Sequence, residues 1–298
     1  FSRSFIEQVK ELSRAVPWAN KSVRGMVRSE YSNQASNLKD CYMCFNGGDS
    51  EDCLYTVSFS KLRDTIDAYA VVGSELCYEV YQTGMSSRCF FSREIISCRD
   101  VWFSYDLVNC HDCVGCVALR NRSYCIFNEQ YTKEEYTERV SEMDLGSYRS
   151  LCTAREQMRA LKRTRPHKYY DGYQNHEVSG NYVYFSKNAH DVYEVGRLED
   201  VRYSENLAND VKDAYDYTNW GEGSELMYEC VSCGDHCRNL KFCFDCWPAV
   251  RDSEYCMNCH SSSDLFGCVG LRNKQYCILN RQYSKDEYLA LSSKLKDQ

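Results

Sequence analysis

The chain has 298 residues, among them 20 cysteines, 25 tyrosines and only 3 prolines, and its formal net charge is −7. Apolar residues make up 43% and charged residues 27%, a balance that excludes a largely disordered chain. No apolar run approaches the ~20 residues of a membrane-spanning helix, and no signal peptide opens the sequence, so we expect a cytoplasmic protein. The acidic balance argues against a general phosphate-binding surface.

The first predicted element is a helix at the start of the chain. Ser4 stands three residues before Glu7, which is the spacing of a capping box, and Pro17 ends the segment. The same spacing from a hydroxyl residue to an acid begins two later segments, at Thr132 and at Ser284. We therefore expect helices over residues 4–16, over residues 132–163 with a pause near Gly146, and over residues 284–296.

Between the first two helices the sequence repeats at every twelfth residue. A period this short fits one coil of a β-solenoid, in which successive rungs stack at the ~4.8 Å spacing of neighbouring strands. The scarcity of proline agrees, because each interior rung donates hydrogen bonds to its neighbours. The column that shows the period consists of Cys41, Cys53, Thr65, Cys77, Cys89, Val101, Cys113 and Cys125.

A second copy of the same unit follows the first. Residues 115–136 and 267–288 match almost residue for residue, and most coils of the second copy are longer by one residue, which is added at a corner. The predicted fold class is mainly β: a tandem-duplicated, right-handed β-solenoid of 12–13-residue rungs with short α-helical caps and linkers. The predicted domains are a first copy over 1–149, with rungs at about 31–130, and a second copy over 150–298, with rungs at about 180–282.

Cysteine placement is the main chemical signal of the sequence. The chain is neither small nor visibly secreted, so we expect free thiols rather than disulfides. One interpretation is that cysteine, a small polarizable residue, fills a narrow core and no cofactor is required. The other is that adjacent C-x-x-C rungs supply four thiolates to zinc or to an iron–sulfur cluster. The candidate metal ligands are Cys230, Cys233, Cys243, Cys246, Cys256 and Cys259.

Other polar residues offer weaker candidates. His111 and His236 stand beside cysteines and could act as ligands or in a Cys–His pair, although a solvated corner position is the simpler interpretation. A column of aspartates could bind calcium or imitate a phosphate backbone, or each could bond backbone N–H groups at a corner. A basic cluster at 162–168 could contact nucleic acid or be a solvated helix end. The aspartates are Asp40, Asp52, Asp64, Asp100 and Asp112.

Three strings carry a resemblance to a known family. They are NLKDCY at 37–42, SELCYE at 74–79 and GCVGLRNKQYCILNRQYSKDEY at 267–288. In these strings, and over nearly its whole length, the chain resembles the uncharacterised cysteine-rich repeat proteins of candidate-phyla (Patescibacteria) bacteria. The resemblance implies that the chain corresponds to the part that follows their zinc-ribbon-like N-terminal segments. No established activity comes with it, so it assigns no functional residue.

The function favoured by the sequence is a non-catalytic β-solenoid scaffold for protein binding or self-assembly, because a solenoid presents long regular faces. The common nucleotide-binding, metalloprotease and hydrolase motifs are absent from the sequence, so we identify no catalytic residue. One alternative is a metal-binding or redox protein that uses zinc or iron–sulfur on its C-x-x-C rungs. Another is a nucleic-acid-associated factor or an acidic DNA mimic. No membrane partner is expected.

Overall fold

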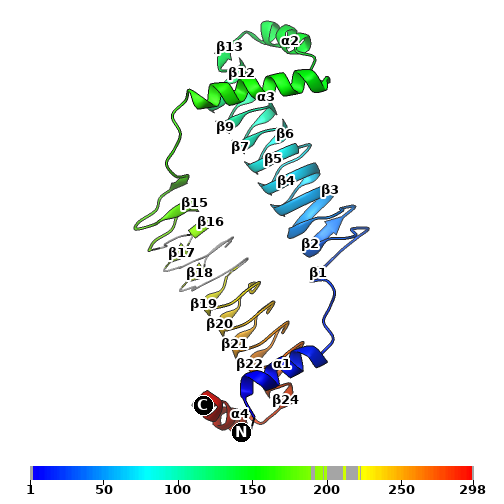
Figure 1. Ribbon diagram of the computed structural model, residues 1–298, viewed down its shortest axis with the longest axis vertical. Helices are drawn as coiled ribbons and strands as arrows, with labels where there is room; N and C mark the ends of the chain where they lie inside the picture. The colour runs from blue at the N-terminus through cyan, green and yellow to red at the C-terminus, as the bar shows by residue number, and fades with distance from the viewer. Residues whose placement is uncertain are drawn as a thin grey trace. The chain divides into compact units, whose positions relative to one another are not determined.

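The computed structural model describes residues 3–296 except for 189–191, 197, 200–210, 213–220 and 222 (Figure 1). The chain forms two compact units. The first-solenoid unit is Ala19–His167, and the second-solenoid unit joins Phe1–Trp18 to Lys168–Gln298. The N-terminal helix therefore belongs with the second sequence copy, and the helix that precedes the second copy belongs with the first.

In the first-solenoid unit the strands stack in parallel, and the register advances by one coil from each rung to the next. Cys53 lies opposite Thr65, and Cys113 lies opposite Cys125. The prediction of a mainly β solenoid whose rungs repeat at every twelfth residue is therefore confirmed. The ladder begins at Val23, earlier than the expected first rung. Its strands are β1 (Val23–Arg24), β2 (Asn33–Lys39), β3 (Phe45–Ser60), β4 (Arg63–Val72), β5 (Tyr78–Gly84), β6 (Ser87–Phe90), β7 (Arg93–Ile96), β8 (Arg99–Trp102), β9 (Tyr105–Val108), β10 (His111–Val114), β11 (Val117–Arg120), β12 (Ser123–Ile126) and β13 (Glu129–Gln130).

Within each coil the backbone repeats every three residues. One residue in three points inward, and the residue before it has a left-handed backbone: Asp40 (φ 54) precedes buried Cys41, and Met43 (φ 52) precedes buried Cys44. None of the described non-glycine residues with positive φ is Val, Ile or Thr. β-Branched side chains clash most in this region of backbone space, which explains their exclusion. Four such steps make one coil, which therefore has four inward columns.

The second-solenoid unit has the same ladder with coils of two lengths. Glu225 pairs with Arg238 across a longer coil, whereas Ser263 pairs with Gln275 across a coil of the same length as in the first unit. The extra residue lies at one corner, since the inward residues Cys233 and Cys237 are four apart rather than three. The described strands are β14 (Gly172–Tyr173), β15 (Gly180–Tyr184), β16 (Val192–Gly196), β17 (Leu198–Glu199), β18 (Val211–Lys212), β19 (Glu225–Tyr228), β20 (Arg238–Lys241), β21 (Arg251–Glu254), β22 (Ser263–Phe266), β23 (Gln275–Ile278) and β24 (Arg281–Gln282).

Both ladders end in the same way. Strand β12 pairs antiparallel with β13, and β23 with β24, so the chain turns back and covers its own strand edge. Helices α2 (Lys133–Glu142) and α4 (Lys285–Lys296) then pack on the closed ends through Tyr136 and Tyr288. The capping boxes predicted at Thr132 and Ser284 are both formed.

The remaining helices are α1 (Phe5–Ala15) and α3 (Tyr148–Arg163). The segment expected over 132–163 is thus divided into α2 and α3 around Gly146. The capping box predicted for α1 is wrong: Ser4 occupies the N-cap, but its side chain makes no capping hydrogen bond, and Arg3 instead ties the start of the helix to Glu11. Among the described residues no helix is long and apolar enough to cross a membrane.

Candidate functional site

The cysteines line the interior of both solenoid units. All are unpaired, and all except Cys152 are buried. Their thiols donate to backbone carbonyls two residues earlier: Cys230 Sγ lies 3.4 Å from Tyr228 O, and Cys243 Sγ lies 3.3 Å from Lys241 O. These buried thiols therefore find backbone hydrogen-bond acceptors, as core residues do.

The six candidate metal ligands lie on three successive rungs, as the sequence predicts. The two cysteines of each C-x-x-C occupy adjacent inward columns, and all six are at most 2% exposed. In the part of the chain that the structure describes, however, no three Cys, His, Asp or Glu side chains are grouped so that they could hold a metal ion. The zinc and iron–sulfur hypothesis therefore gains no support from this arrangement.

The two candidate histidines point away from the thiols. His111 Nδ1 lies 2.7 Å from Asp112 Oδ2, and His236 Nδ1 lies 2.9 Å from Asp235 Oδ1. The neighbouring Cys113 is fully buried, and its sulfur donates to the carbonyl of His111 rather than meeting the imidazole. These residues do not form a Cys–His nucleophile pair.

The aspartate column lies at a corner of the first-solenoid unit. Asp40 and Asp100 have left-handed backbones, which aspartate tolerates well. Their carboxylates bind arginines one rung earlier, with 2.7 Å from Arg28 Nη2 to Asp40 Oδ2 and 2.6 Å from Arg88 Nη2 to Asp100 Oδ2. The hydrogen bond from Arg28 lowers the pKa of Asp40. Arginine therefore neutralises the charge of these two carboxylates. This pairing does not favour a calcium site or a phosphate mimic.

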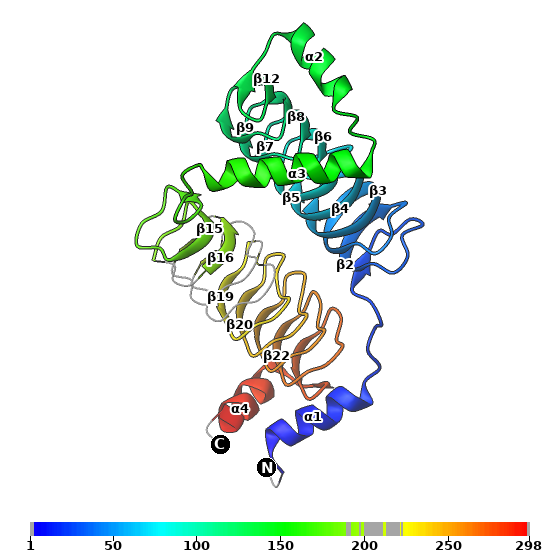
Figure 2. The ribbon, with the colours of Figure 1, turned by 45° about the horizontal axis from the view of Figure 1, so that its top comes forward.

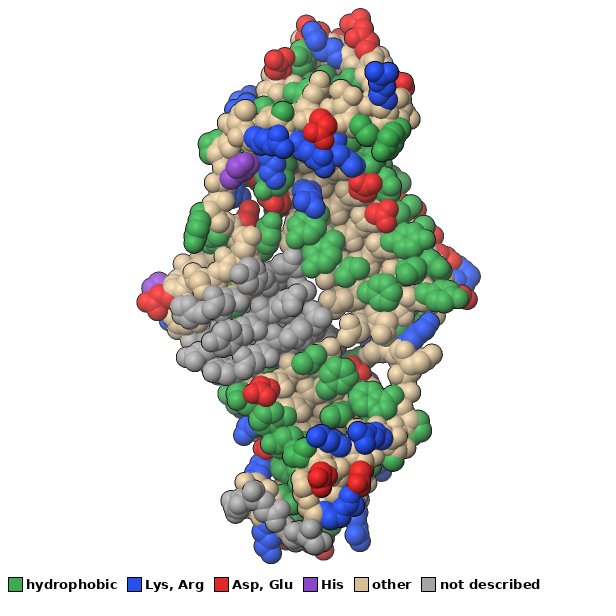
Figure 3. All heavy atoms as spheres, in the orientation of Figure 1, with side chains coloured by type: hydrophobic (Ala, Val, Ile, Leu, Met, Phe, Trp, Pro, Cys, Tyr) green, Lys and Arg blue, Asp and Glu red, His purple; other side chains and the backbone are tan. Residues whose placement is uncertain are grey.

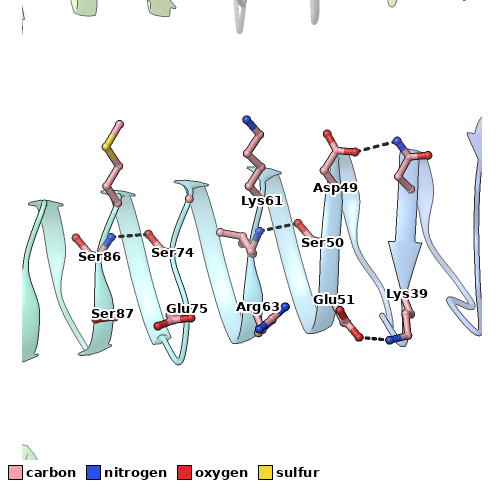
Figure 4. Close-up of a pocket in the computed structure, with 14 residues that line it drawn as sticks. Lys39, Asp49, Ser50, Glu51, Lys61, Arg63, Ser74, Glu75, Ser86 and Ser87 are labelled. Carbon is pink, nitrogen blue, oxygen red and sulfur yellow. Dashed lines mark hydrogen bonds and ion pairs between the residues drawn. The ribbon is translucent and has the colours of Figure 1, made fainter.

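A shallow groove lies on one face of the first-solenoid unit (Figure 4). Three hydroxyls of its floor are engaged with the backbone: Ser50, Ser74 and Ser86 accept the N–H groups of Leu62, Ser86 and Cys98 at 2.9–3.2 Å. The charged side chains stand on its edges and point to opposite sides, Lys61 to one and Glu51 and Arg63 to the other. Since these groups diverge, they do not converge on one small ligand.

A different face of the first-solenoid unit is apolar along most of its length. It consists of the two outward columns that lie between the Cys41 column and the next inward column, and we call it the apolar face. Glu30 lies at its start, and two further acids, Asp67 and Glu79, interrupt it. Its apolar members are Tyr31, Tyr42, Met43, Leu54, Tyr55, Ile66, Tyr78, Phe90, Phe91, Trp102, Phe103, Val114, Ile126 and Phe127.

Helix α3 packs on the far part of the apolar face (Figures 1 and 2). The Arg155 guanidinium lies 5.2 Å from the centre of the Phe91 ring, and its Nη2 bonds Glu79 Oε2 at 2.9 Å. Lys162 Nζ lies 3.2 Å from the centre of the Tyr105 ring, on the adjoining face beyond the next inward column, and the loss of solvent there lowers the pKa of Lys162. The apolar face thus accepts part of an amphipathic helix that carries cations along one edge.

Helix α1 makes a related contact in the second-solenoid unit. The Phe5 ring packs on the Phe266 ring with centroids 4.7 Å apart. Gly267 (φ 64) makes room for the helix, because a Cβ there would lie 2.6 Å from Phe5 Cζ and 2.9 Å from Val9 Cγ2. Phe266 and Gly267 correspond to Val114 and Gly115 of the first copy, so each solenoid receives a helix on the same face.

The near part of the apolar face carries no helix of its own unit, and we call it the exposed stripe: Tyr31, Tyr42, Met43, Leu54, Tyr55 and Ile66. The Tyr42 ring meets Tyr31 and Tyr55 edge to face, with centroids 5.4 and 5.8 Å apart. Tyr31 remains 62% exposed and Tyr55 49%. Figure 3 shows hydrophobic side chains gathered on this unit beside the basic side chains of α3. The sequence analysis missed this site because the twelve-residue period alone does not show which residues of a rung point outward.

Comparison with known proteins adds no activity. No family model and no curated protein matches the chain. Among solved structures, a "putative acetyltransferase from Desulfovibrio desulfuricans G20" is 10% identical at a TM-score of 0.16, covering 96% of this chain and 81% of that chain. A UDP-N-acetylglucosamine acyltransferase from Campylobacter jejuni is 9% identical at a TM-score of 0.11, covering 94% and 82%. Similarity at this level carries no argument about function.

Proposed function

We propose that this protein is a non-catalytic scaffold that binds an amphipathic helix of a partner protein on the exposed stripe. One observation carries the proposal: the far part of the apolar face already holds a helix, α3, whereas the near part presents the same kind of surface uncovered. Contiguous exposed aromatic residues of this kind are typical of protein interaction sites.

The partner helix is expected to resemble α3 in its chemistry. In α3 the half-buried or buried side chains recur at helical spacing, from Leu151 through Ala154 to Met158, and Arg155 stands beside them. Arg155 combines a ring contact with an ion pair to Glu79, and Asp67 offers a second carboxylate one rung nearer the exposed stripe. A helix with an apolar face and arginine on its edge therefore matches both the rings and the acids.

Two sources of binding energy are available at the exposed stripe. Burial of apolar area stabilises by ~25 cal/mol per Å², and aromatic side chains bury the largest areas. A cation over a ring adds about 0.5–1 kcal/mol at an exposed site. The rings of the exposed stripe are already held against each other, so little side-chain freedom is lost when a partner binds.

The test uses a labelled peptide with the sequence of residues 147–165, which contains α3, as the probe. Its binding to the full chain is measured by fluorescence anisotropy. We expect saturable binding that is about tenfold or more weaker in the double variant Tyr42→Ser/Tyr55→Ser, because central aromatic residues dominate such interfaces. Exchanging the peptide arginine, R155E, is expected to weaken binding further and to reduce its dependence on salt.

The matched control is the double variant Val72→Ser/Ile96→Ser. Val72 and Ile96 are both 49% exposed, like Tyr55, but lie outside the apolar face. The proposal requires this variant to bind the peptide as the parent protein does. Absence of saturable binding, or equal weakening in both double variants, contradicts it; binding of a second copy of the chain in place of the peptide would point to self-assembly.

A further inference from the structure

The groove of the first-solenoid unit is bordered by two straight rows of side chains that cross successive rungs (Figure 4). The backbone pairing between rungs keeps both rows in register. We call them the first row and the second row. The first row is Lys39, Glu51, Arg63 and Glu75, and the second row is Asn37, Asp49, Lys61, Gly73 and Met85.

The charges of these rows are only partly paired within the unit. Lys39 forms an ion pair with Glu51. In contrast, the exposed side chains of Lys61, Arg63 and Glu75 take part in no ion pair within the described part of the chain. Arg63 and Glu75 do not pair with each other even though they lie in register on neighbouring rungs. Three charged groups along the groove are therefore available to a partner.

The two rows change the sign of their charge at the same place. The first row alternates from positive through negative and positive to negative. In the second row Asp49 and Lys61 lie on the same two rungs as Glu51 and Arg63. Both rows therefore reverse sign about one line, which runs between these two rungs. Turning the rows end for end about that line places every charge opposite a charge of the other sign.

We propose that this groove is a dimer interface, on which the first-solenoid unit of a second copy of the chain lies antiparallel and face to face. A two-fold axis along the line just defined relates the two copies, so each row faces the same row of the other copy. This inference concerns a different face from the exposed stripe and does not depend on the proposed function. The ion pairs, each formed twice, are Glu51 with Arg63, Lys39 with Glu75, and Asp49 with Lys61.

The spacing of the rungs favours a second copy as the occupant. Rungs repeat every ~4.8 Å, whereas side chains on one face of an extended peptide repeat every ~6.6 Å, so a single peptide falls out of step with the charges. A second solenoid has the same repeat and stays in step along both rows. The ends of the second row also fit, because Met85, which is 74% exposed, meets Gly25, which lies one rung before Asn37 and has no side chain.

The oligomeric state of the full chain tests the interface. Size-exclusion chromatography with light scattering, over a series of protein concentrations, measures the dissociation constant of the dimer. Exposed ion pairs are weak singly and are screened by salt, so we expect this constant to rise by about tenfold or more from about 50 to about 500 mM salt. A monomer at every concentration, or open-ended assemblies larger than a dimer, would overturn the proposal.

Charge reversal locates the interface. Lys61→Glu places two acids opposite each other across the axis, and Asp49→Lys places two cations there. Each variant alone is therefore expected to dimerise about tenfold or more weakly than the parent protein. An equimolar mixture of the two is expected to form mixed dimers, because each reversed charge then faces an opposite charge on the other copy. Native mass spectrometry, with one variant labelled with nitrogen-15, separates mixed dimers from like dimers.

The matched control is Lys133→Glu, which changes the net charge by the same amount as Lys61→Glu. Lys133 is exposed at the start of α2, does not line the groove and forms no ion pair among the described residues. This variant is expected to dimerise as the parent protein does. Circular dichroism checks that each variant is folded. Equal weakening in the control, or a mixture of the two folded variants that stays monomeric, contradicts the proposed interface.

Discussion

The side-chain amide of Asn128 takes the place of a peptide group opposite Val117. Asn128 Nδ2 donates to Val117 O at 2.8 Å, and Asn128 Oδ1 accepts from Val117 N at 2.8 Å. Asn280 and Val269 repeat the arrangement in the second-solenoid unit, also at 2.8 Å for both bonds. At the end of each ladder one side chain thus pairs the exposed peptide group of Val117 or Val269, where a further rung would otherwise be needed, while β13 and β24 cover the neighbouring strands.

Removing this amide is expected to destabilise the end of the ladder. Asn128→Ala leaves the N–H and C=O of buried Val117 without these bonds, at a cost of about 2 kcal/mol or more. Asn128→Asp keeps an acceptor but loses the donor, so an intermediate cost is expected. Urea unfolding followed by circular dichroism measures both. Unchanged stability of Asn128→Ala would contradict the assigned role.

The three-residue period predicts that substitutions at two adjacent isoleucines change the free energy of unfolding by very different amounts. Ile95 is fully buried, whereas Ile96 is 49% exposed. Ile95→Ala is expected to lower the free energy of unfolding by about 2–5 kcal/mol through loss of core packing. Ile96→Ala is expected to change it by less than about 0.5 kcal/mol. Urea unfolding distinguishes the two, and similar losses at both positions would contradict the three-residue period.

The contact between α1 and Gly267 can be tested by comparing substitutions at two glycines. Gly267→Ala brings a Cβ against Phe5 and Val9, whereas a Cβ at Gly73 meets nothing closer than Met85 Cγ at 3.9 Å. Both positions have positive φ, so both variants carry a similar backbone penalty of about 1 kcal/mol. Only Gly267→Ala is expected to release α1, seen as faster hydrogen exchange over Phe5–Ala15. Equal exchange in the two variants would show that α1 does not depend on this contact.

A half-buried histidine predicts a pH dependence. His260 Nε2 has no hydrogen-bond partner, and burial followed by the charge of Arg272 lowers the pKa of His260 from 6.5 to about 4, opposed by Asp245. The unfolded chain therefore binds a proton first as the pH falls. The contribution of His260 to stability is complete above pH 6.5 and is lost between pH 6.5 and about 4. Urea unfolding across this range is expected to show a smaller loss for His260→Gln than for the parent protein; equal losses would exclude His260 as the cause.

The rung period could be predicted from the sequence because cysteine recurs in one column, at Cys41, Cys53 and Cys77. The duplication could be predicted because residues 115–136 match residues 267–288. The three-residue period could also have been found, since the positions that precede the inward residues contain no Val, Ile or Thr among the described left-handed residues. The twelve-residue period alone places Tyr42 and Tyr55 in a rung, but only the three-residue period shows that their side chains point outward. The right-handed coil stays a prediction.

The distribution of the helices between the units could not be predicted. Sequence adjacency suggests that α1 packs on the ladder that follows it, but α1 packs on the second-solenoid unit and α3 on the first. Repeated copies present equivalent faces, so local pattern alone does not decide which copy receives a given helix. The inward cysteines followed directly from the period.

The measurement that tests the proposed function most directly is photo-crosslinking of the 147–165 peptide to the full chain, with a benzophenone in place of the side chain at its Met158 position. Mass spectrometry then identifies the joined fragments. Binding to the exposed stripe predicts crosslinks to fragments that contain Tyr42, Met43 or Tyr55. Crosslinks confined to the Phe91 region that α3 covers, or to other faces, would contradict it.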